Sequence, residues 1–185
     1  VSNVGWQDKT NFGQVCGTTG KNQSMEAFLE KIDGYNDLSG SIKDAAHVSN
    51  VGWQSFSLDG AITGTIGQNK SMEAIKIEIT GEVSNYYDIY YRAHCSDFGW
   101  LGWARNGEEA GSQGYAKKLE ALQVQLIKKG DPAPGPTDSH FKILKAWYSA
   151  PVSNIGWQTR VEFGNVCGTT SQNLPMEAFN AMVDG

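Results

Sequence analysis

The sequence has no apolar run near the roughly 18 residues that a membrane-spanning helix requires, and no basic segment followed by a hydrophobic stretch that would mark a signal peptide. It also has no cluster of basic residues: 15 Lys and Arg are scattered among 20 Asp and Glu, for a formal net charge of −5. Nucleic acids and anionic membranes select for clustered Lys and Arg. The composition therefore argues against both as partners and predicts no membrane span.

Motifs that carry chemistry are equally scarce. No pair of Cys or His residues has zinc-ligand spacing, and the sequence contains no P-loop, dinucleotide-binding or Gly-x-Ser-x-Gly motif. We therefore expect no metal, no cofactor and no enzymatic activity.

Glycine and tryptophan, by contrast, are abundant and recur in a pattern. The 22 Gly and six Trp favour short strands joined by tight turns. Three markers return in one register, which identifies internal repeats. They are a Gly-Trp segment at residues 3–7, 50–54, 97–101 and 154–158, a glycine pair at 13/17, 60/64, 107/111 and 164/168, and Met/Leu-Glu-Ala at 25–27, 72–74, 119–121 and 176–178.

The repeat boundaries follow from the spacing of the Gly-Trp tryptophans, at positions 6, 53, 100 and 157. The first two intervals are 47 residues, and the third is ten longer because a Pro-rich stretch is inserted. We predict repeat 1 (1–34, without its leading strand), repeat 2 (35–81), repeat 3 (82–130), a semi-rigid linker (131–139) and repeat 4 (140–185). Repeats 1 and 4 resemble each other most, so repeat 4 is predicted to open a second three-repeat unit.

Each repeat is predicted to be built of β-strands. Residues 88–95 and 119–126 alternate apolar and polar side chains, and Asn106-Gly107 and Asp59-Gly60 are favoured hairpin turns. Residues 25–32 and 176–183 also fit helical spacing, but their register with repeats 2 and 3 favours strands. The predicted fold is all-β, with three repeats in a closed pseudo-threefold unit, β-trefoil-like in preference to β-prism-like.

The motifs at residues 90–94, 98–107, 109–111 and 119–121 together resemble the clostridial hydrophobic repeats with a Gly-Trp signature, the ChW repeats. The resemblance covers essentially the whole chain, although repeats 1 and 4 have Phe-Gly where the family usually has Asp-Gly or Asn-Gly. It implies a secreted or cell-surface protein of Gram-positive anaerobes, acting in adhesion or in polysaccharide or cell-wall binding. It brings no catalytic residues.

Aromatic residues are the candidates for binding a sugar, because their faces pack on the apolar faces of pyranose rings. A tryptophan present in every repeat is expected to serve a shared core, which assigns Trp6, Trp53, Trp100 and Trp157 to structure. Aromatic residues outside that pattern are the candidate ligand-binding residues: Trp103, Trp147, Tyr86, Tyr87, Tyr90 and Tyr115.

A glutamate recurs in the third marker of every repeat, as Glu26, Glu73, Glu120 and Glu177. Because burial of an unpaired carboxylate is costly, we expect each to meet a backbone N–H, an indole N–H, an Arg or a His. Paired carboxylates would point to glycoside hydrolysis, but recurrence in every repeat favours a structural role. His47 and His94 share one register in different repeats and therefore do not form a metal site.

The three cysteines leave two alternatives. If the first unit closes as a ring, Cys16 and Cys95 could form a disulfide, with Cys167 left over; otherwise all three are small buried thiols.

The leading functional expectation is a non-catalytic, multivalent module that binds carbohydrate or cell-wall polysaccharide. The alternative is a structural or adhesive surface protein whose copies assemble into a fibre or layer by exchanging strands.

Overall fold

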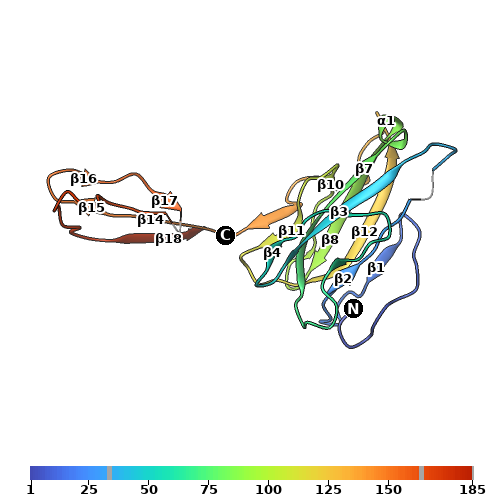
Figure 1. Ribbon diagram of the computed structural model, residues 1–185, viewed down its shortest axis with the longest axis horizontal. Coiled ribbons are helices and arrows are strands. Elements are labelled where there is room, and N and C mark those ends of the chain that lie inside the picture. Colours follow the sequence, from blue (N-terminus) through green and yellow to red (C-terminus); the bar gives the residue numbers. More distant parts are fainter. Residues whose placement is uncertain (33–34, 163–164, 185) are drawn as a thin grey trace. The chain divides into compact units, whose positions relative to one another are not determined.

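The computed structural model describes residues 1–32, 35–162 and 165–184, and nearly all of its regular structure is β-strand (Figure 1). The chain divides into two compact units, Val1–Lys142 and Ile143–Gly185. The prediction of an all-β chain of tandem repeats is confirmed. No helix among the described residues is long and apolar enough to span a membrane.

The strands follow the repeats. Repeat 1 contains β1 (Val15–Gly17) and β2 (Ala27–Phe28). Repeat 2 contains β3 (Ser41–Val48), β4 (Gly52–Trp53), β5 (Ser57–Leu58), β6 (Thr63–Gly64) and β7 (Met72–Thr80). Repeat 3 contains α1 (Val83–Tyr86), β8 (Tyr87–Cys95), β9 (Gly99–Trp100), β10 (Ala104–Arg105), β11 (Ala110–Gln113) and β12 (Leu119–Lys128). Repeat 4 contains β13 (Phe141–Ile143), β14 (Lys145–Ser149), β15 (Pro151–Val152), β16 (Gly156–Trp157), β17 (Val161–Glu162) and β18 (Asn180–Asp184).

The two segments with helical spacing do not form helices. Repeat 1 has β2 within residues 25–32, and β18 begins within residues 176–183. The register with the other repeats therefore predicted the right structure, and local periodicity predicted the wrong one.

The first three repeats pair with one another in a cycle. The alanine of each Met/Leu-Glu-Ala marker lies opposite a glycine of another repeat: Ala27 opposite Gly64, Ala74 opposite Gly111 and Ala121 opposite Gly17. Repeat 1 thus joins repeat 2, repeat 2 joins repeat 3, and repeat 3 returns to repeat 1. We call each of these junctions a seam.

Glycine is required at each seam for two reasons. Gly17, Gly64 and Gly111 have φ of +106°, +101° and +122°, which disfavours any residue with a Cβ. A Cβ at each would also overlap the carbonyl oxygen of the marker glutamate across the seam, Glu120, Glu26 or Glu73. The second glycine of the repeat is therefore where two backbones approach most closely.

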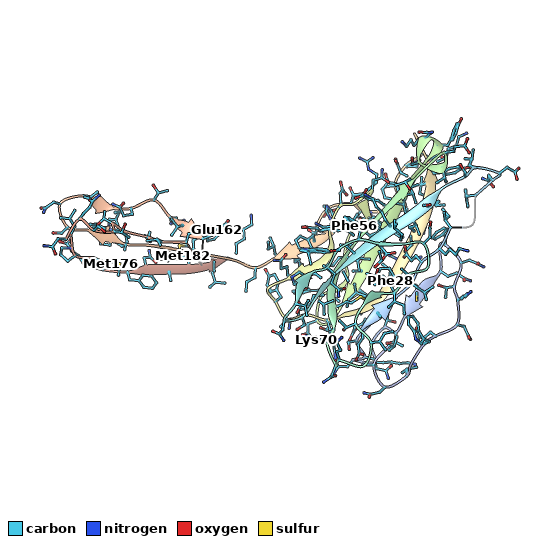
Figure 2. The ribbon with its side chains drawn as sticks, viewed as in Figure 1. Phe28, Phe56, Lys70, Glu162, Met176 and Met182 are labelled. Carbon is cyan, nitrogen blue, oxygen red and sulfur yellow. The ribbon has the colours of Figure 1, made fainter. Side chains whose placement is uncertain are left out.

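Within repeats 2 and 3, the first long strand pairs with the last: β3 with β7 and β8 with β12. Their inward side chains, among them Ile42, Ile75, Ile89 and Tyr91, are fully buried in one core. Phe28 from repeat 1 joins that core at 4% exposure (Figure 2). The ladders form separate sheets and, among the described residues, no closed barrel. A trefoil-like or prism-like arrangement stays a prediction.

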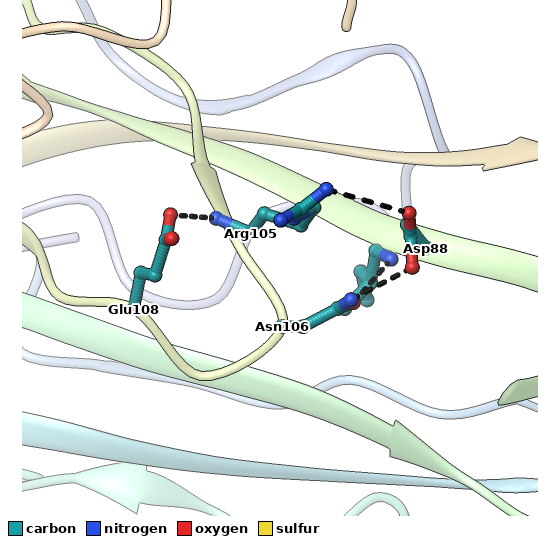
Figure 3. A network of polar contacts seen from close by, with 5 residues as sticks. Asp88, Arg105, Asn106 and Glu108 are labelled. Atoms are coloured by element: carbon teal, nitrogen blue, oxygen red, sulfur yellow. Dashed lines mark hydrogen bonds and ion pairs between the residues drawn. The ribbon is translucent and has the colours of Figure 1, made fainter. Parts of the chain in front are cut away.

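The predicted Asn-Gly turn of repeat 3 is fixed by its own side chains (Figure 3). Asn106 accepts a hydrogen bond from the backbone N–H of Ile89 (3.0 Å) and donates one to Asp88 (2.8 Å). Glu108 accepts a hydrogen bond from the backbone N–H of Arg105, whose guanidinium lies 3.8 Å from Asp88. Asp59 has the equivalent role in repeat 2: its carboxylate accepts a hydrogen bond from the backbone N–H of Ile42 (2.8 Å). In both repeats the turn residue thus ties down the start of the leading strand.

The Pro-rich segment 131–139 packs against repeat 3. The backbone N–H of Trp103 donates to the carbonyl of Pro136 (2.9 Å), and that of Gly111 donates to the carbonyl of His140 (3.0 Å). Gly135 lies against the Trp103 indole. The segment therefore belongs to the first unit rather than standing free between the two.

The second unit buries few side chains. Its β14 pairs with both β17 and β18, and β15 pairs with β16. Of its described side chains, only Ser149, Ala150 and Val152 are nearly inaccessible, whereas Met176 and Met182 are 58% and 42% exposed (Figure 2).

Candidate functional site

The marker glutamates of repeats 2 and 3 are buried beside histidines. Nδ1 of His47 lies 3.1 Å from Oε2 of Glu73, and Nδ1 of His94 lies 3.2 Å from Oε2 of Glu120. These are ion-pair distances without hydrogen-bond alignment. A break in strand register falls at each glutamate, as in a β-bulge, which re-aims a side chain. In both repeats, a histidine lies beside the marker carboxylate, as expected.

Each histidine also contacts the Gly-Trp tryptophan of its own repeat. The rings of His47 and Trp53 meet edge to face with centroids 5.5 Å apart, and those of His94 and Trp100 with centroids 5.3 Å apart. The imidazole therefore occupies the space between the glutamate and the tryptophan.

A groove of about 410 Å³ lies at the corresponding place in repeat 1. No histidine lies between Glu26 and Trp6 among the residues that line it. The groove is lined by the N-terminal turn, by the start of β2 and by the loop after β6: Val1, Ser2, Asn3, Gly5, Trp6, Glu26, Ala27, Thr65, Ile66, Gly67 and Asn69. It thus follows the seam between repeats 1 and 2.

Backbone hydrogen bonds hold the walls of this groove in place. The N–H of Thr65 donates to the carbonyl of Glu26 (2.8 Å) across the seam. On the opposite wall, Ser2 and Ser24 are joined by two bonds, of 2.8 Å to a backbone carbonyl and 3.1 Å to the Ser2 hydroxyl. The groove is therefore formed by fixed segments, as small-ligand sites usually are.

The indole of Trp6 is the accessible aromatic face in the groove, at 57% exposure. Its counterparts in repeats 2 and 3 are covered by cations: the ammonium of Lys76 lies 4.3 Å from the Trp53 ring centroid, and the guanidinium of Arg92 lies 4.6 Å from that of Trp100. Within the described residues no cation and no ring is found against Trp6. With the Glu26 carboxylate and the amides of Asn3 and Asn69 nearby, the groove offers one apolar face and several polar groups.

A buried acidic cluster lies at the same seam, in the core rather than in the groove. Asp44 is 1% exposed and accepts a hydrogen bond from the Thr63 hydroxyl. Burial raises its pKa to about 6, although the Thr63 bond opposes the shift and Asp59 adds to it. Burial, and then the charge of Asp44, also raise the pKa of Glu30 well above its usual range. Oε2 of Glu30 is buried with no hydrogen-bond partner among the described residues.

Sequence reasoning missed this cluster, although a signal was present. Glu30 occupies the register of Ile77 and Val124, and Asp44 that of Tyr91. An acid at a position that is apolar or aromatic in the other repeats is a departure that self-comparison can detect. Because Asp44 is inaccessible, the cluster is not placed to act on a substrate.

Two of the six candidate ligand-binding aromatics are buried. Trp103 is 3% exposed and Tyr90 is 6% exposed, so the expectation that they lie on the surface is wrong. The cause for Trp103 is the Pro-rich segment, which covers it, together with the Arg92 guanidinium 4.8 Å from its ring.

The other four aromatics lie in different segments of the fold, although Tyr86 and Tyr87 are consecutive. Tyr86 is exposed in α1, while Tyr87 begins β8 and accepts a hydrogen bond from Asn36 (2.8 Å). Tyr115 meets Phe98 edge to face, and Trp147 lies half-buried in β14 of the second unit. None of the six lines the groove.

The prediction that the Gly-Trp tryptophans form the core is also wrong. Trp6 and Trp157 are 57% and 61% exposed, and Trp53 and Trp100 are half-buried. Glu26 is half-buried and Glu177 exposed, so only the marker glutamates beside histidines are buried. Recurrence in every repeat here marks a position at a seam, where accessibility depends on what the neighbouring repeat supplies.

All three cysteines are free thiols. Cys16 lies opposite Leu122, which lies opposite Ala93, so a whole strand separates β1 from the strand of Cys95. Two strand spacings, about 9.5 Å, exceed the reach of a disulfide. Burial raises the pKa of Cys95 to about 12 and raises that of Cys16 as well, which keeps both thiols protonated.

Comparison with known proteins gives one match. The family model described as "Clostridial hydrophobic W" (ChW) matches residues 1–31, 47–81, 94–128 and 152–185, which together are most of the chain. Each of these four segments lies within one of the four predicted repeats, and in repeats 2, 3 and 4 it begins 12 residues after the predicted start. No curated protein and no solved structure matches.

Proposed function

Because this chain belongs to the clostridial hydrophobic W family, a family of tandem repeats, we propose that it is a non-catalytic module of a secreted or cell-surface protein and that it binds carbohydrate in the groove beside Trp6. The observation that carries the proposal is the combination of an accessible indole face with a carboxylate and amides in one preformed groove. Sugars have apolar C–H faces that pack on aromatic rings and hydroxyls that pair with such polar groups.

The proposed ligand is a neutral polysaccharide. Glu26 lines the groove, and the whole chain carries a formal net charge of −5. Both disfavour an acidic glycan, because like charges repel. A chain of neutral sugars, from plant or cell-wall polysaccharide, meets no such penalty.

A pseudo-threefold unit, trefoil-like or prism-like, is part of the proposal because the three seams are cyclic. The groove lies at the seam between repeats 1 and 2, whereas His47 and His94 lie beside the marker glutamates of repeats 2 and 3. Multivalent binding would then arise from several three-repeat units rather than from three sites in one unit.

The test compares the binding of the unchanged chain and of Trp6→Ala to insoluble neutral polysaccharides and to purified Gram-positive cell walls. We expect the unchanged chain to bind with a dissociation constant of about 0.1–1 mM, and Trp6→Ala to bind at least about tenfold more weakly because the stacking face is lost. Trp157→Ala is the matched control, since Trp157 is equally exposed but does not line the groove. Full binding by Trp6→Ala, or no binding to any of these polysaccharides, would show the proposal to be wrong.

A further inference from the structure

Repeat 2 carries an exposed apolar patch that the other repeats do not share. Phe56, Leu58 and Ile62 are 44%, 61% and 47% exposed, and we call these three residues the repeat-2 patch. No other repeat has apolar residues at all three positions. The residues in the same register are Lys9, Asn11 and Val15 in repeat 1, Trp103, Arg105 and Glu109 in repeat 3, and Arg160, Glu162 and Val166 in repeat 4.

The repeat-2 patch surrounds the turn that follows β5, on the outer side of β3. Leu58 lies opposite Lys43 of β3, and the ammonium of Lys43 is 4.7 Å from the centroid of the Phe56 ring. Phe56 and Leu58 therefore share one face of the sheet, as residues two apart in an extended segment do. The hydroxyl of Ser57 donates a hydrogen bond to the carbonyl of Ile62 (3.4 Å), which holds Ile62 beside β5.

Repeat 3 shows what binds at the position of Phe56. Trp103, in the same register, is covered by the Pro-rich segment: its backbone N–H donates to the carbonyl of Pro136 (2.9 Å), and Gly135 lies against its indole. Here too a cation lies on the ring, since the guanidinium of Arg92 is 4.8 Å from its centroid. With the segment in place, Trp103 is 3% exposed. An aromatic ring beside an outward backbone N–H thus holds an extended proline-rich chain.

Phe56 has the same features without the cover. Its backbone N–H has no acceptor among the described residues, whereas that of Trp103 is satisfied by Pro136. Leu58 and Ile62 add apolar surface on which proline rings can pack. A proline-rich segment is extended before it binds and so loses little conformational entropy, which is why exposed aromatic surfaces recognise such segments.

We propose that the repeat-2 patch binds an extended proline-rich segment of a partner protein, as repeat 3 binds the Pro-rich segment of its own chain. A backbone carbonyl of the bound segment accepts the N–H of Phe56, and its proline rings pack on the three apolar side chains. No residue of the patch lines the groove beside Trp6, so this site is separate from the proposed glycan site.

One difference between the repeats limits how closely the bound segment follows that model. Ser55 stands where repeat 3 has Gly102, and a Cβ at Gly102 would overlap the carbonyl oxygen of Asp138. The bound segment must therefore lie farther from the backbone at Ser55 than residues 138–139 lie from Gly102. The match is to residues 134–136 of the Pro-rich segment, which pack on the ring itself.

The experiment uses the full chain and a synthetic peptide with the sequence of residues 131–140, titrated by NMR. We expect saturable shifts of the Phe56 amide with a dissociation constant of about 0.1–1 mM. Phe56→Ala should weaken binding at least about tenfold, because the ring on which the peptide packs is lost. Val51→Ala is the matched control: Val51 is 50% exposed in the same repeat but lies outside the patch, and its loss should leave binding unchanged.

A second variant tests the register. Ser55→Gly gives repeat 2 the glycine that repeat 3 has in Gly102, so the peptide should approach more closely and bind at least about threefold more tightly. Unchanged or weaker binding by this variant would show that the peptide does not follow the register of the Pro-rich segment on repeat 3.

Three further outcomes would overturn the inference. The first is no binding at about 5 mM peptide. The second is binding that Phe56→Ala leaves unchanged, which would place the peptide elsewhere, for example on Trp103 in exchange for the chain's own segment. The third is self-association of the chain that Phe56→Ala abolishes, which would make a second copy the occupant. Trp6→Ala should leave peptide binding unchanged, so this inference and the proposed glycan site can fail separately.

Discussion

At the scale of single residues, the seam glycines define the repeat more strictly than the tryptophans that give it its signature. The tryptophans range from half-buried to 61% exposed, and their contacts differ between repeats. Gly17, Gly64 and Gly111 have the same left-handed backbone and the same close approach to a glutamate carbonyl in all three seams.

This contrast leads to a prediction for Gly111→Ala. The change should lower the free energy of unfolding by about 2–4 kcal/mol, for two reasons. Alanine is strained at a positive φ, and its Cβ would overlap backbone atoms that cannot move aside. Gly20→Ala is the matched control: Gly20 also has positive φ (+67°), but a Cβ there meets nothing within 4 Å. It should lose only about 1 kcal/mol. Chemical denaturation followed by tryptophan fluorescence measures both, and equal losses would contradict the role of close approach.

At the scale of elements, the seam between repeats 1 and 2 is distinguished by its buried acids. The folded-state pKa of Asp44, about 6, is raised above the ordinary 3.8. The folded state therefore favours the protonated acid. The resulting stabilisation is complete below about pH 4 and is lost as the pH rises to about 6. Glu30, whose pKa is also raised, likewise stabilises the folded state less as the pH rises.

We therefore predict that Asp44→Asn stabilises the first unit at pH 7 to 8 by about 1–2 kcal/mol, because the amide cannot ionise. At pH 4 the difference between the variant and the unchanged chain should be much smaller. Glu177→Gln is the control, since Glu177 is an exposed carboxylate in the second unit and should leave the stability of the first unit unchanged. Thermal unfolding from pH 4 to 8 measures both, and a variant that is destabilised at pH 8 would refute the prediction.

The same seam shows what sequence could and could not provide. The repeats, the hairpin turns at Asp59 and Asn106, and the alternation of β8 all follow from local patterns. Accessibility did not, because Trp103 is covered by the segment 131–139, whereas among the described residues no cation or ring lies against Trp6. The accessibility of a side chain depends on contacts between segments far apart in the chain, and such contacts cannot be read from a single sequence.

At the scale of the whole molecule, the two units differ in how much they bury. The first has a continuous core in which most inward side chains are inaccessible, whereas the second leaves most of its apolar side chains exposed. We predict that, in the dilute monomer, amides of β14 and β18 exchange with solvent at least about 100-fold faster than those of β7, β8 and β12. Native-state hydrogen exchange measures this directly. Equal protection in both units would mean that the second unit has a stabilising partner even in dilute solution.

The cyclic seams also set an order in which the molecule can form. Two of them join residues 37 positions apart (64 − 27 and 111 − 74), but the third joins Gly17 to Ala121, across 104 positions (121 − 17). Among the strands of the first three repeats, β1 comes first in the chain, yet its strand partner is β12, which comes last. Closing that long loop costs more chain entropy than either of the other two. Of the three seams, the one that joins β1 to β12 is therefore expected to form last.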